Sequence, residues 1–289
     1  MKILLTGAEG MLAGDVRRVG ERAGHELILV DLPELDITDE RAVLALYERE
    51  RPQATINCAA WTDVDGAETN FETAHAVNAQ GAANLARAAA GIDTPLLHIS
   101  TDYVFDGVPP LDATGRPRPY VESDPTDPQS NYGKTKLAGE RLVLAASPAN
   151  TVVRTAWLYG VDGPNFAATM LRLAGERDAV QVVDDQIGSP TWSGHLAPAI
   201  VGLVERGVSG LVHLAGAGSV SWHGFAKEIF RQAEVDCRVE AIPSSQMARP
   251  APRPAYSVLE TEREDVLPMG PWQDGLAGYL AARAGVARS

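Results

Sequence analysis

Short apolar runs alternate with longer helical patterns through the first half of the chain, and this alternation constrains the fold more than any other feature. Runs rich in isoleucine, valine and leucine, without strict polar–apolar alternation, predict strands buried on both faces at 2–6, 26–30, 54–57, 96–100 and 151–154. Between them, periodicity or alanine content predicts helices at 11–23, 39–50, 70–90 and 132–145. Alternating strands and helices form right-handed βαβ units, so the sequence predicts an α/β fold with a doubly wound parallel sheet.

The pattern is less regular after residue 160. It predicts helices at 166–175, 194–206, 222–234 and 272–284, and short strands at 180–183, 211–214 and 237–242. Many prolines make 107–130 a predicted long loop, and the proline-rich tract 249–254 should follow the surface. We therefore predict a first domain over 1–160 and a smaller α/β lobe over 161–289 that returns elements to the first domain.

Composition excludes several classes of protein. The 289 residues include 25 Lys and Arg against 38 Asp and Glu, and the resulting net charge of −13 disfavours nucleic acid and anionic membranes as partners. Two cysteines, Cys58 and Cys237, are too few for a disulfide framework. No uncharged apolar run reaches the ~18 residues of a membrane span, and no signal peptide is visible before the first strand. We expect a cytoplasmic protein.

A glycine-rich loop links the first strand to the first helix. The segment from Gly7 through Gly10 to Ala13 has the pattern GxxGxxA, in which glycines permit a tight turn and close approach to a pyrophosphate at the helix N-terminus. Its place between strand and helix favours a dinucleotide site over an unliganded turn, and makes 1–160 a Rossmann-like cofactor domain. The second strand ends at Asp31, a carboxylate either placed for the adenosine ribose or merely exposed; in the first role it favours NAD over NADP.

Two further segments belong to this end of the site. Asp36 and Ile37 follow the turn after the second strand and are placed to flank an adenine. Ala59 and Ala60 follow the third strand, where small side chains allow either close cofactor packing or ordinary packing of a helix on the sheet.

A tyrosine and a lysine four residues apart are the leading catalytic candidates. Tyr132 and Lys136 share one face of a predicted helix, where an ammonium favours the phenolate and lowers the phenol pKa toward a range useful for proton transfer. The alternative is a surface tyrosine beside a solvated lysine. Thr101, at the end of the fourth strand, is placed to bind a substrate carbonyl, and Ser100 competes with it for that role.

Together these motifs resemble the extended short-chain dehydrogenase/reductases that modify sugar nucleotides. Longer blocks resemble, more narrowly, the dTDP-4-dehydrorhamnose reductases, and they lie at 35–39, 62–68, 100–107, 132–140, 154–160, 183–191 and 253–259. The resemblance therefore covers almost the whole chain.

That resemblance implies reduction of the 4-keto group of dTDP-4-dehydro-L-rhamnose to dTDP-L-rhamnose. It implies Tyr132 as the proton donor, Lys136 as the partner of Tyr132 and a ligand of the cofactor ribose, and Thr101 as the hydroxyl that orients the carbonyl. The implied cofactor contacts are Gly7, Gly10, Met11, Leu12, Asp31, Asp36, Ile37, Ala59, Ala60, Trp61, Ile99, Tyr132 and Lys136. The implied substrate contacts are Thr101, Asp102, Trp157 and Arg253, with the arginine facing either the diphosphate or a surface acid. Relatives use NADPH as well as NADH, so both cofactors, and dual use, remain open.

Alternatives stay open at this stage. A sugar-nucleotide epimerase or dehydratase uses the same Tyr–Lys pair, and a non-catalytic regulatory subunit like that of methionine adenosyltransferase shares the fold. The histidine spacings predict no metal site. Asp184 and Asp185 could bind Mg²⁺, but two adjacent carboxylates are more often solvated residues of a turn. Both a monomer and a homodimer fit the sequence.

Overall fold

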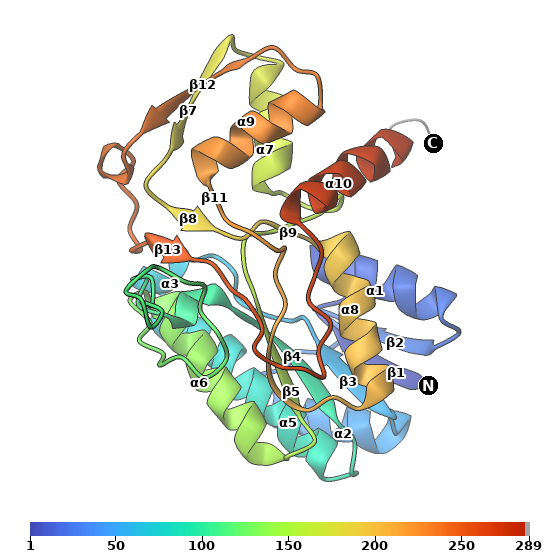
Figure 1. Ribbon diagram of the computed structural model, residues 1–289. Helices are drawn as coiled ribbons and strands as arrows, with labels where there is room; N and C mark the ends of the chain where they lie inside the picture. Colours follow the sequence, from blue (N-terminus) through green and yellow to red (C-terminus); the bar gives the residue numbers. More distant parts are fainter. Residues whose placement is uncertain (287–289) are drawn as a thin grey trace.

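Six parallel strands form the central sheet of the protein (Figure 1), in the order β10-β5-β4-β3-β1-β2. The structure is a computed structural model that describes residues 1–286. The strands are β1 (Lys2–Thr6), β2 (Glu26–Val30), β3 (Ala54–Asn57), β4 (Leu96–Thr101), β5 (Thr151–Thr155) and β10 (Gly210–His213). The α/β fold with a doubly wound parallel sheet that the sequence predicts is confirmed, and β4 extends one residue further than predicted, to Thr101.

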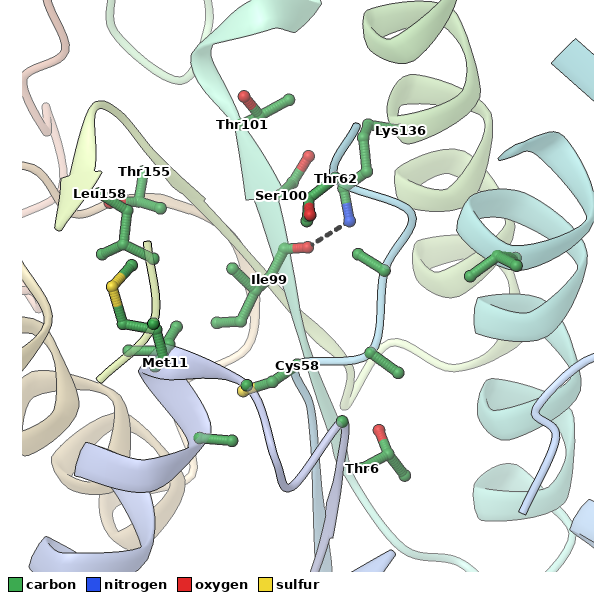
Figure 2. Close-up of a pocket in the computed structure, with 18 of the residues that line it drawn as sticks. Thr6, Met11, Cys58, Thr62, Ile99, Ser100, Thr101, Lys136, Thr155 and Leu158 are labelled. Carbon is green, nitrogen blue, oxygen red and sulfur yellow. Dashed lines mark hydrogen bonds between the residues drawn. The ribbon is translucent and has the colours of Figure 1, made fainter. Parts of the chain in front are cut away.

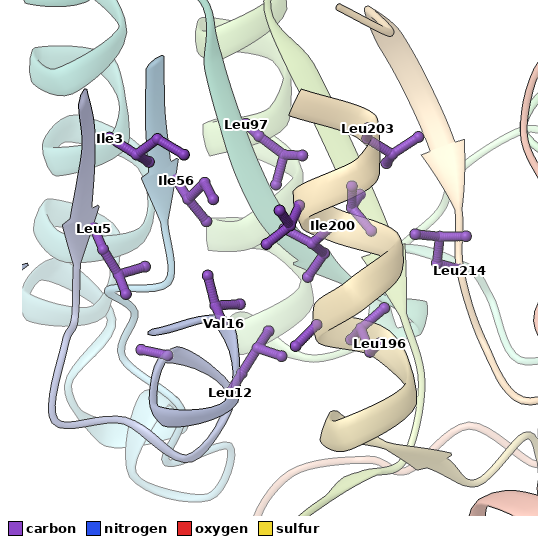
Figure 3. Close-up of a cluster of buried hydrophobic side chains, with 14 of the residues drawn as sticks. Ile3, Leu5, Leu12, Val16, Ile56, Leu97, Leu196, Ile200, Leu203 and Leu214 are labelled. Atoms are coloured by element: carbon purple, nitrogen blue, oxygen red, sulfur yellow. The ribbon is translucent and has the colours of Figure 1, made fainter. Parts of the chain in front are cut away.

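Helices cover both faces of this sheet because each strand is apolar on both sides. Ile3 and Leu5 pack with Leu12 of α1 and Ile200 of α8 (Figure 3), whereas Leu4 between them faces the other side. The first face is covered by α1 (Met11–Arg22) and α8 (Ser193–Arg206); the second by α2 (Glu40–Glu50), α5 (Ala82–Ala90) and α6 (Asn131–Ala146). Each layer buries a continuous apolar cluster, which supplies most of the stabilisation of such a domain.

The strand order reverses between β1 and β3, which lie side by side with β2 beyond one and β4 beyond the other. In open parallel sheets a ligand binds at such a reversal, outside the carboxyl ends of the strands. Here those ends lead into residues 7–10 and 58–60. The topology therefore brings together the glycine loop and the small residues after β3.

A smaller lobe lies beyond the carboxyl edge of the sheet (Figure 1). Its core packs aromatic and branched side chains, with Tyr159, Phe225 and Tyr279 fully buried. Its helices are α7 (Phe166–Ala174), α9 (Trp222–Gln232) and α10 (Trp272–Val286). Its strand pairs are β7 (Ala179–Val183) with β12 (Arg238–Ile242), β6 (Leu158–Tyr159) with β9 (Thr191–Trp192), and β8 (Ile187–Gly188) with both β11 (Val220–Ser221) and β13 (Tyr256–Ser257). Although α8 and β10 follow residue 160, they lie in the first lobe. The domain boundary at residue 160 stays a prediction.

The helix predicted over 70–90 is interrupted. The structure has α3 (Gly66–Thr69), α4 (Phe71–His75), a π-helix η1 (Ala76–Gly81) and then α5. Within the π-helix, the buried Asn78 accepts a hydrogen bond from Trp61 N–H at 2.8 Å and donates to Trp61 O at 3.1 Å and to Thr135 Oγ1 at 3.0 Å. The wider turn therefore ties α6 to the loop after β3, consistent with the frequent occurrence of π-bulges at functional sites.

The predicted loop over 107–130 contains no helix or strand, and its course is fixed by side chains. Tyr120 is buried and stacks on Phe105 with ring centres 4.1 Å apart, and Arg118 pairs with Asp124 at 2.6 Å. The tract 249–254 likewise has no regular structure, and Ala251 is its only buried residue. Two short 3₁₀ turns complete the described elements, η2 (Asp102–Val104) and η3 (Ser244–Gln246).

Candidate active site

A pocket of about 750 Å³ opens at the carboxyl ends of β1, β3, β4 and β5. Its walls include Met11 and Cys58 near the glycine loop, and Thr101 and Lys136 near the end of β4 (Figure 2). Most of the residues predicted to bind cofactor or substrate line it: Gly7, Gly10, Met11, Leu12, Asp31, Asp36, Ile37, Ala59, Ala60, Ile99, Thr101, Asp102, Tyr132, Lys136 and Trp157. Trp61 and Arg253 do not line it, and no residue of 107–130 does.

The glycine loop is shaped for close approach of a ligand backbone. Gly7 has φ +67°, and a Cβ there would lie 2.5 Å from Ala59 N, so no other residue fits without displacing the loop after β3. Gly10 is the N-cap of α1 and provides no side-chain cap, so the first N–H groups of the helix are not satisfied by a capping side chain. A pyrophosphate fits this end because free N–H groups and the helix dipole both favour an anion.

Asp31 lies at the other end of the pocket, held in place by two backbone groups. Its Oδ2 accepts a hydrogen bond from Glu9 N–H at 2.9 Å and its Oδ1 accepts one from Leu32 N–H at 2.8 Å. Asp36 accepts hydrogen bonds from the backbone and hydroxyl of Thr38, and Ile37 is buried beside it. The carboxylate, the apolar wall and the glycine loop together suit the adenosine half of a dinucleotide.

Lys136 is the buried cation of the site. It extends from α6 toward β4, where its Nζ donates to Ile99 O at 2.6 Å (Figure 2) and lies 3.3 Å from His98 Nε2. Burial lowers the pKa of Lys136 to about 8, although the nearby carboxylate of Glu140 acts in the opposite direction. The ammonium is therefore held by a strand carbonyl, and it titrates close to neutral pH.

Tyr132 shares this helix face, but its pKa moves opposite to the direction expected from the sequence. Burial raises the pKa of Tyr132 to about 12, a hydrogen bond with Thr101 lowers it in part, and the charge of Asp102 raises it. The cause of the difference is that Lys136 points to the Ile99 carbonyl and contributes no counteracting effect. A phenol in this environment stays protonated at neutral pH, which suits a proton donor.

Ser100 and Thr101, the two candidates for binding a substrate carbonyl, both line the pocket but have different partners. Ser100 donates its hydroxyl proton to Glu140 at 2.5 Å, in a buried cluster in which Arg154 also binds Glu140 through two nitrogens at 2.9 and 2.7 Å. Thr101 instead lies beside Tyr132 and donates to Asp102 Oδ1 at 2.9 Å. Thr101 is therefore the hydroxyl that shares the pocket end with the phenol.

Asp102 is an unusual neighbour for these groups. It is 3% exposed, and its Oδ2 has no hydrogen-bond partner among the residues that the structure describes. Burial raises the pKa of Asp102 to about 6, against a lowering by the nearby hydroxyls of Ser257 and Thr101. A buried carboxyl with one free oxygen at the wall of a pocket is a candidate for binding a polar ligand group.

Two tryptophans meet where the lobes join. Trp157 adopts φ +46°, uncommon for a bulky residue, and its ring stacks on Trp222 at 3.5 Å between centres and an angle of 3°. Its indole N–H donates to Ser257 Oγ at 3.2 Å. Both rings line the pocket, yet Trp222 lies 65 positions later in the chain and belongs to no motif, so sequence reasoning missed it as a site residue.

Arg253 is placed next to the pocket wall. It donates to Asp65 Oδ2 at 2.9 Å and to Ala251 O at 3.1 Å, so the structure shows it paired with an acid. Its charge nevertheless reaches Tyr103, a lining residue, where it opposes the rise in pKa that burial causes. Its predicted role toward a diphosphate, and that of Trp61 toward the cofactor, stay predictions.

Neither metal chemistry nor a membrane span has support in the part of the chain that the structure describes. Residues 1–286 contain no group of three or more potential ligands close enough to hold a metal ion. Asp184 instead accepts a hydrogen bond from Ser221, and Asp185 binds Ser244. No described helix is long and apolar enough to cross a bilayer.

Comparison with known proteins identifies the family. Residues 1–284 match the family described as the RmlD substrate binding domain. The chain belongs to this family. It is 44% identical to the dTDP-4-dehydrorhamnose reductase of Mycobacterium tuberculosis, over 98% of this chain and 93% of that protein. The resemblance drawn from the sequence motifs is therefore confirmed.

Two further relatives bear on substrate and cofactor. The dTDP-4-keto-6-deoxy-D-glucose reductase of Streptomyces niveus is 45% identical, over 89% of this chain and 87% of that protein. The dTDP-4-dehydrorhamnose reductase of Bacillus anthracis, solved in complex with NADP, superposes with a TM-score of 0.92 at 36% identity, covering 97% of this chain and 99% of the other.

Proposed function

We propose that this chain uses NADH or NADPH to reduce the 4-keto group of dTDP-4-dehydro-L-rhamnose, giving dTDP-L-rhamnose. The observation that carries the proposal is the pocket itself, which joins a cradle for a dinucleotide to the half-buried Tyr132 and the buried Lys136 and Thr101 in one cavity. Membership of the RmlD family, with relatives named as reductases of dTDP-linked keto-sugars, supports the same reaction.

Each catalytic side chain has a distinct task. A bound reduced nicotinamide supplies the hydride to the carbonyl carbon. Tyr132, protonated at neutral pH, gives its proton to the carbonyl oxygen, which Thr101 orients. We assign Lys136 the positioning of the cofactor: it extends from the same helix as Tyr132, and its ammonium is placed to bind the cofactor ribose. The product is an alcohol, and one cofactor is oxidised for each sugar reduced.

An epimerase and a non-catalytic subunit remain the competing functions. An epimerase regenerates its nicotinamide, so it consumes no net cofactor, and a regulatory subunit turns over nothing. A purified enzyme supplied with dTDP-4-dehydro-L-rhamnose is expected to consume one NAD(P)H per product. Parallel assays with dTDP-4-keto-6-deoxy-D-glucose, the sugar named for the Streptomyces niveus relative, test whether this enzyme also accepts a substrate of that stereochemistry.

Replacing Tyr132 by phenylalanine tests the mechanism. Tyr132→Phe removes only the proton donor, so we expect kcat to fall by about 10²–10⁴-fold, the usual contribution of general acid catalysis, while cofactor binding persists. Stopped-assay turnover and calorimetric binding of the cofactor measure the two effects separately. Turnover close to that of the wild type would contradict the role of Tyr132. A cytoplasmic location and a monomeric or dimeric state stay predictions.

A further inference from the structure

We propose that His98 is a positioning residue for Lys136: its ring presents an N–H to the lysine nitrogen and thereby favours the neutral amine over the ammonium. His98 lies on β4 behind the pocket wall and does not line the pocket. The inference rests on the proposed function, because it concerns the lysine of that same site. It adds a residue that lies outside the motifs of the sequence.

Three polar side chains form a buried row across the sheet. Thr6 of β1 pairs with Asn57 of β3, and Asn57 pairs with His98 of β4, so their side chains point to the same face. That face is covered by α5 and α6, and Lys136 reaches the row from α6. All four residues are at most 2% exposed. Polar groups buried this deeply need hydrogen-bond partners within the protein, so each proton in the row has a defined place.

A backbone group fixes the orientation of Asn57. Its Oδ1 accepts hydrogen bonds from Ala59 N–H at 3.0 Å and from the Thr6 hydroxyl at 2.7 Å. A backbone N–H only donates, so exchanging the amide oxygen and nitrogen of Asn57 would set two donors against each other. The amide Nδ2 therefore faces His98 Nδ1, 2.9 Å away, and donates to it.

The tautomer of His98 follows from that contact. Because Nδ1 accepts a hydrogen bond, it carries no proton. Burial and the charge of Lys136 hold the pKa of His98 well below its usual value, so the ring is neutral near pH 7. A neutral imidazole has one N–H, which is then at Nε2, and this nitrogen lies 3.3 Å from Lys136 Nζ.

An amine and an ammonium respond differently to this N–H. A neutral amine has a lone pair that accepts it, while the amine still donates to Ile99 O at 2.6 Å (Figure 2). An ammonium has only donors, so it would face the ring N–H donor to donor. His98 therefore acts in the same direction as burial, which lowers the pKa of Lys136 to about 8.

The other ionisable groups around Lys136 do not have this effect. Glu140, one turn along α6, and Cys58, after β3, favour the ammonium through negative charge. Burial raises the pKa of the Cys58 thiol to about 12, so its contribution is absent while the lysine titrates. Tyr132, on the same helix face, is also uncharged in that range, because its pKa is about 12. Of these neighbours, His98 alone opposes the ammonium.

Nuclear magnetic resonance of lysine side chains measures this effect in the full-length protein without relying on turnover. The chain has four lysines, Lys2, Lys134, Lys136 and Lys227, of which Lys136 alone is buried, so its carbon-13 Cε signal should be the one that titrates near pH 8. In His98→Leu the ring N–H is lost, and we expect that midpoint to rise by about 0.5–1 pH unit, the equivalent of one hydrogen bond.

The sign of the shift decides the proposal. If His98 Nε2 accepted a hydrogen bond from the ammonium, His98→Leu would lower the midpoint; a lowered or unchanged midpoint therefore overturns the proposal. His195→Leu, at an exposed histidine that does not line the pocket, is the matched control and should leave the midpoint unchanged.

The tautomer can also be measured in the wild type, which keeps the test valid if His98→Leu does not fold. Among residues 1–286, the buried histidines are His98 and His213. His213 Nδ1 lies 3.0 Å from Glu260 O and 3.3 Å from Tyr120 O, so this nitrogen carries its proton. Nitrogen-15 spectra of histidine-labelled protein, with the buried rings recognised by slow exchange of their N–H protons, should show one ring of each tautomer. Two Nδ1–H rings would overturn the assignment.

Kinetics then connect the tautomer with the reaction. Because the Lys136 ammonium is placed to bind the cofactor ribose, the loss of activity toward high pH should move upward in His98→Leu by the same amount as the resonance midpoint. A shifted midpoint in an enzyme that reduces no keto-sugar would overturn the proposed function and leave the role of His98 standing. Turnover with an unshifted midpoint would do the reverse.

Discussion

At the scale of single residues, burial moves the pKa values of the catalytic end toward neutral side chains. The pKa of Lys136 falls to about 8, that of Tyr132 rises to about 12 and that of Asp102 rises to about 6, with burial the largest cause in each case. Each shift means that the folded protein holds the charged form less readily than the unfolded chain does. Near neutral pH the shifts of Lys136 and Asp102 therefore reduce the stability of the protein, whereas Tyr132 is uncharged in both states and costs nothing there.

Asp102 permits a direct test of that loss of stability. Its pKa rises from 3.8 to about 6, so the folded state binds a proton more readily, and stability falls as pH rises from about 4 to 6. Above pH 6 the loss is complete, and at 1.36 kcal/mol per pKa unit it amounts to about 3 kcal/mol. We expect Asp102→Asn to be more stable than the wild type at pH 8 by up to this amount, in urea unfolding followed by circular dichroism.

The same experiment at lower pH supplies the control. The gain should shrink toward pH 4.5, where much of the folded wild type already has Asp102 protonated. Asp127→Asn, at an exposed carboxylate, should change stability by less than about 0.5 kcal/mol at either pH. A gain that grows as the pH falls would contradict the argument.

Lys136 sets a second pH dependence, in this case of activity. With a pKa of about 8, its ammonium predominates below pH 8 and is lost above it, so the cofactor ribose loses a charged donor on the basic side. We expect kcat to decline with an apparent pKa near 8. Lys136→Arg keeps the charge at all these pH values, and any residual activity in that variant should show no decline between pH 8 and 9.5.

At the scale of elements, one buried carboxylate joins three of them. Glu140 on α6 binds Ser100 of β4 and, through two hydrogen bonds, Arg154 of β5, and the side chains of this ion pair are only 3% and 4% exposed. It follows Lys136 by one helical turn, so the contact that fixes α6 on the sheet also fixes the catalytic face of that helix.

Loss of Glu140 should therefore be costly. Glu140→Ala leaves the buried guanidinium of Arg154 unpaired, and we expect a loss of about 3–5 kcal/mol in the free energy of unfolding. Glu21→Ala, which removes an exposed partner of Arg17 on α1, is the matched control and should cost no more than about 0.5 kcal/mol. Urea denaturation of both variants measures the difference. A loss below 1 kcal/mol in Glu140→Ala would show that the cluster does not anchor α6.

At the scale of the whole molecule, the features that the sequence predicts are those encoded locally. Strands β1 to β5 and the glycine loop follow from apolar runs and one motif. The π-helix around Asn78 interrupts the helix predicted over 70–90. The partners of Asn78 in this turn, Trp61 and Thr135, are 17 and 57 positions away in the chain, so no local pattern predicts it. Trp222 reaches the pocket only by stacking on a ring of the other lobe. Such contacts arise from the packing of distant segments, and no local pattern of residues records them.

Net charge also acts on the whole molecule, and it sharpens the role of Arg253. A protein with a charge of −13 repels a nucleotide diphosphate, so binding needs a local cation at the pocket. Arg253 pairs with Asp65 in the loop whose Thr62 and Val64 line the pocket. Loss of one charge-assisted contact corresponds to about 1.5–3 kcal/mol, so we expect Arg253→Ala to raise the substrate KM by roughly 10- to 100-fold with little change in kcat.

Arg249 provides the comparison for that experiment, because it also faces Asp65, at 3.5 Å, but is 52% exposed. If both arginines merely neutralised Asp65, Arg249→Ala and Arg253→Ala would alter KM alike. We expect instead an effect below threefold for Arg249→Ala, since a solvated charge contributes little to binding. Steady-state kinetics with the nucleotide-sugar varied at saturating NADH distinguish the two, and an unchanged KM in Arg253→Ala would remove this arginine from the substrate site.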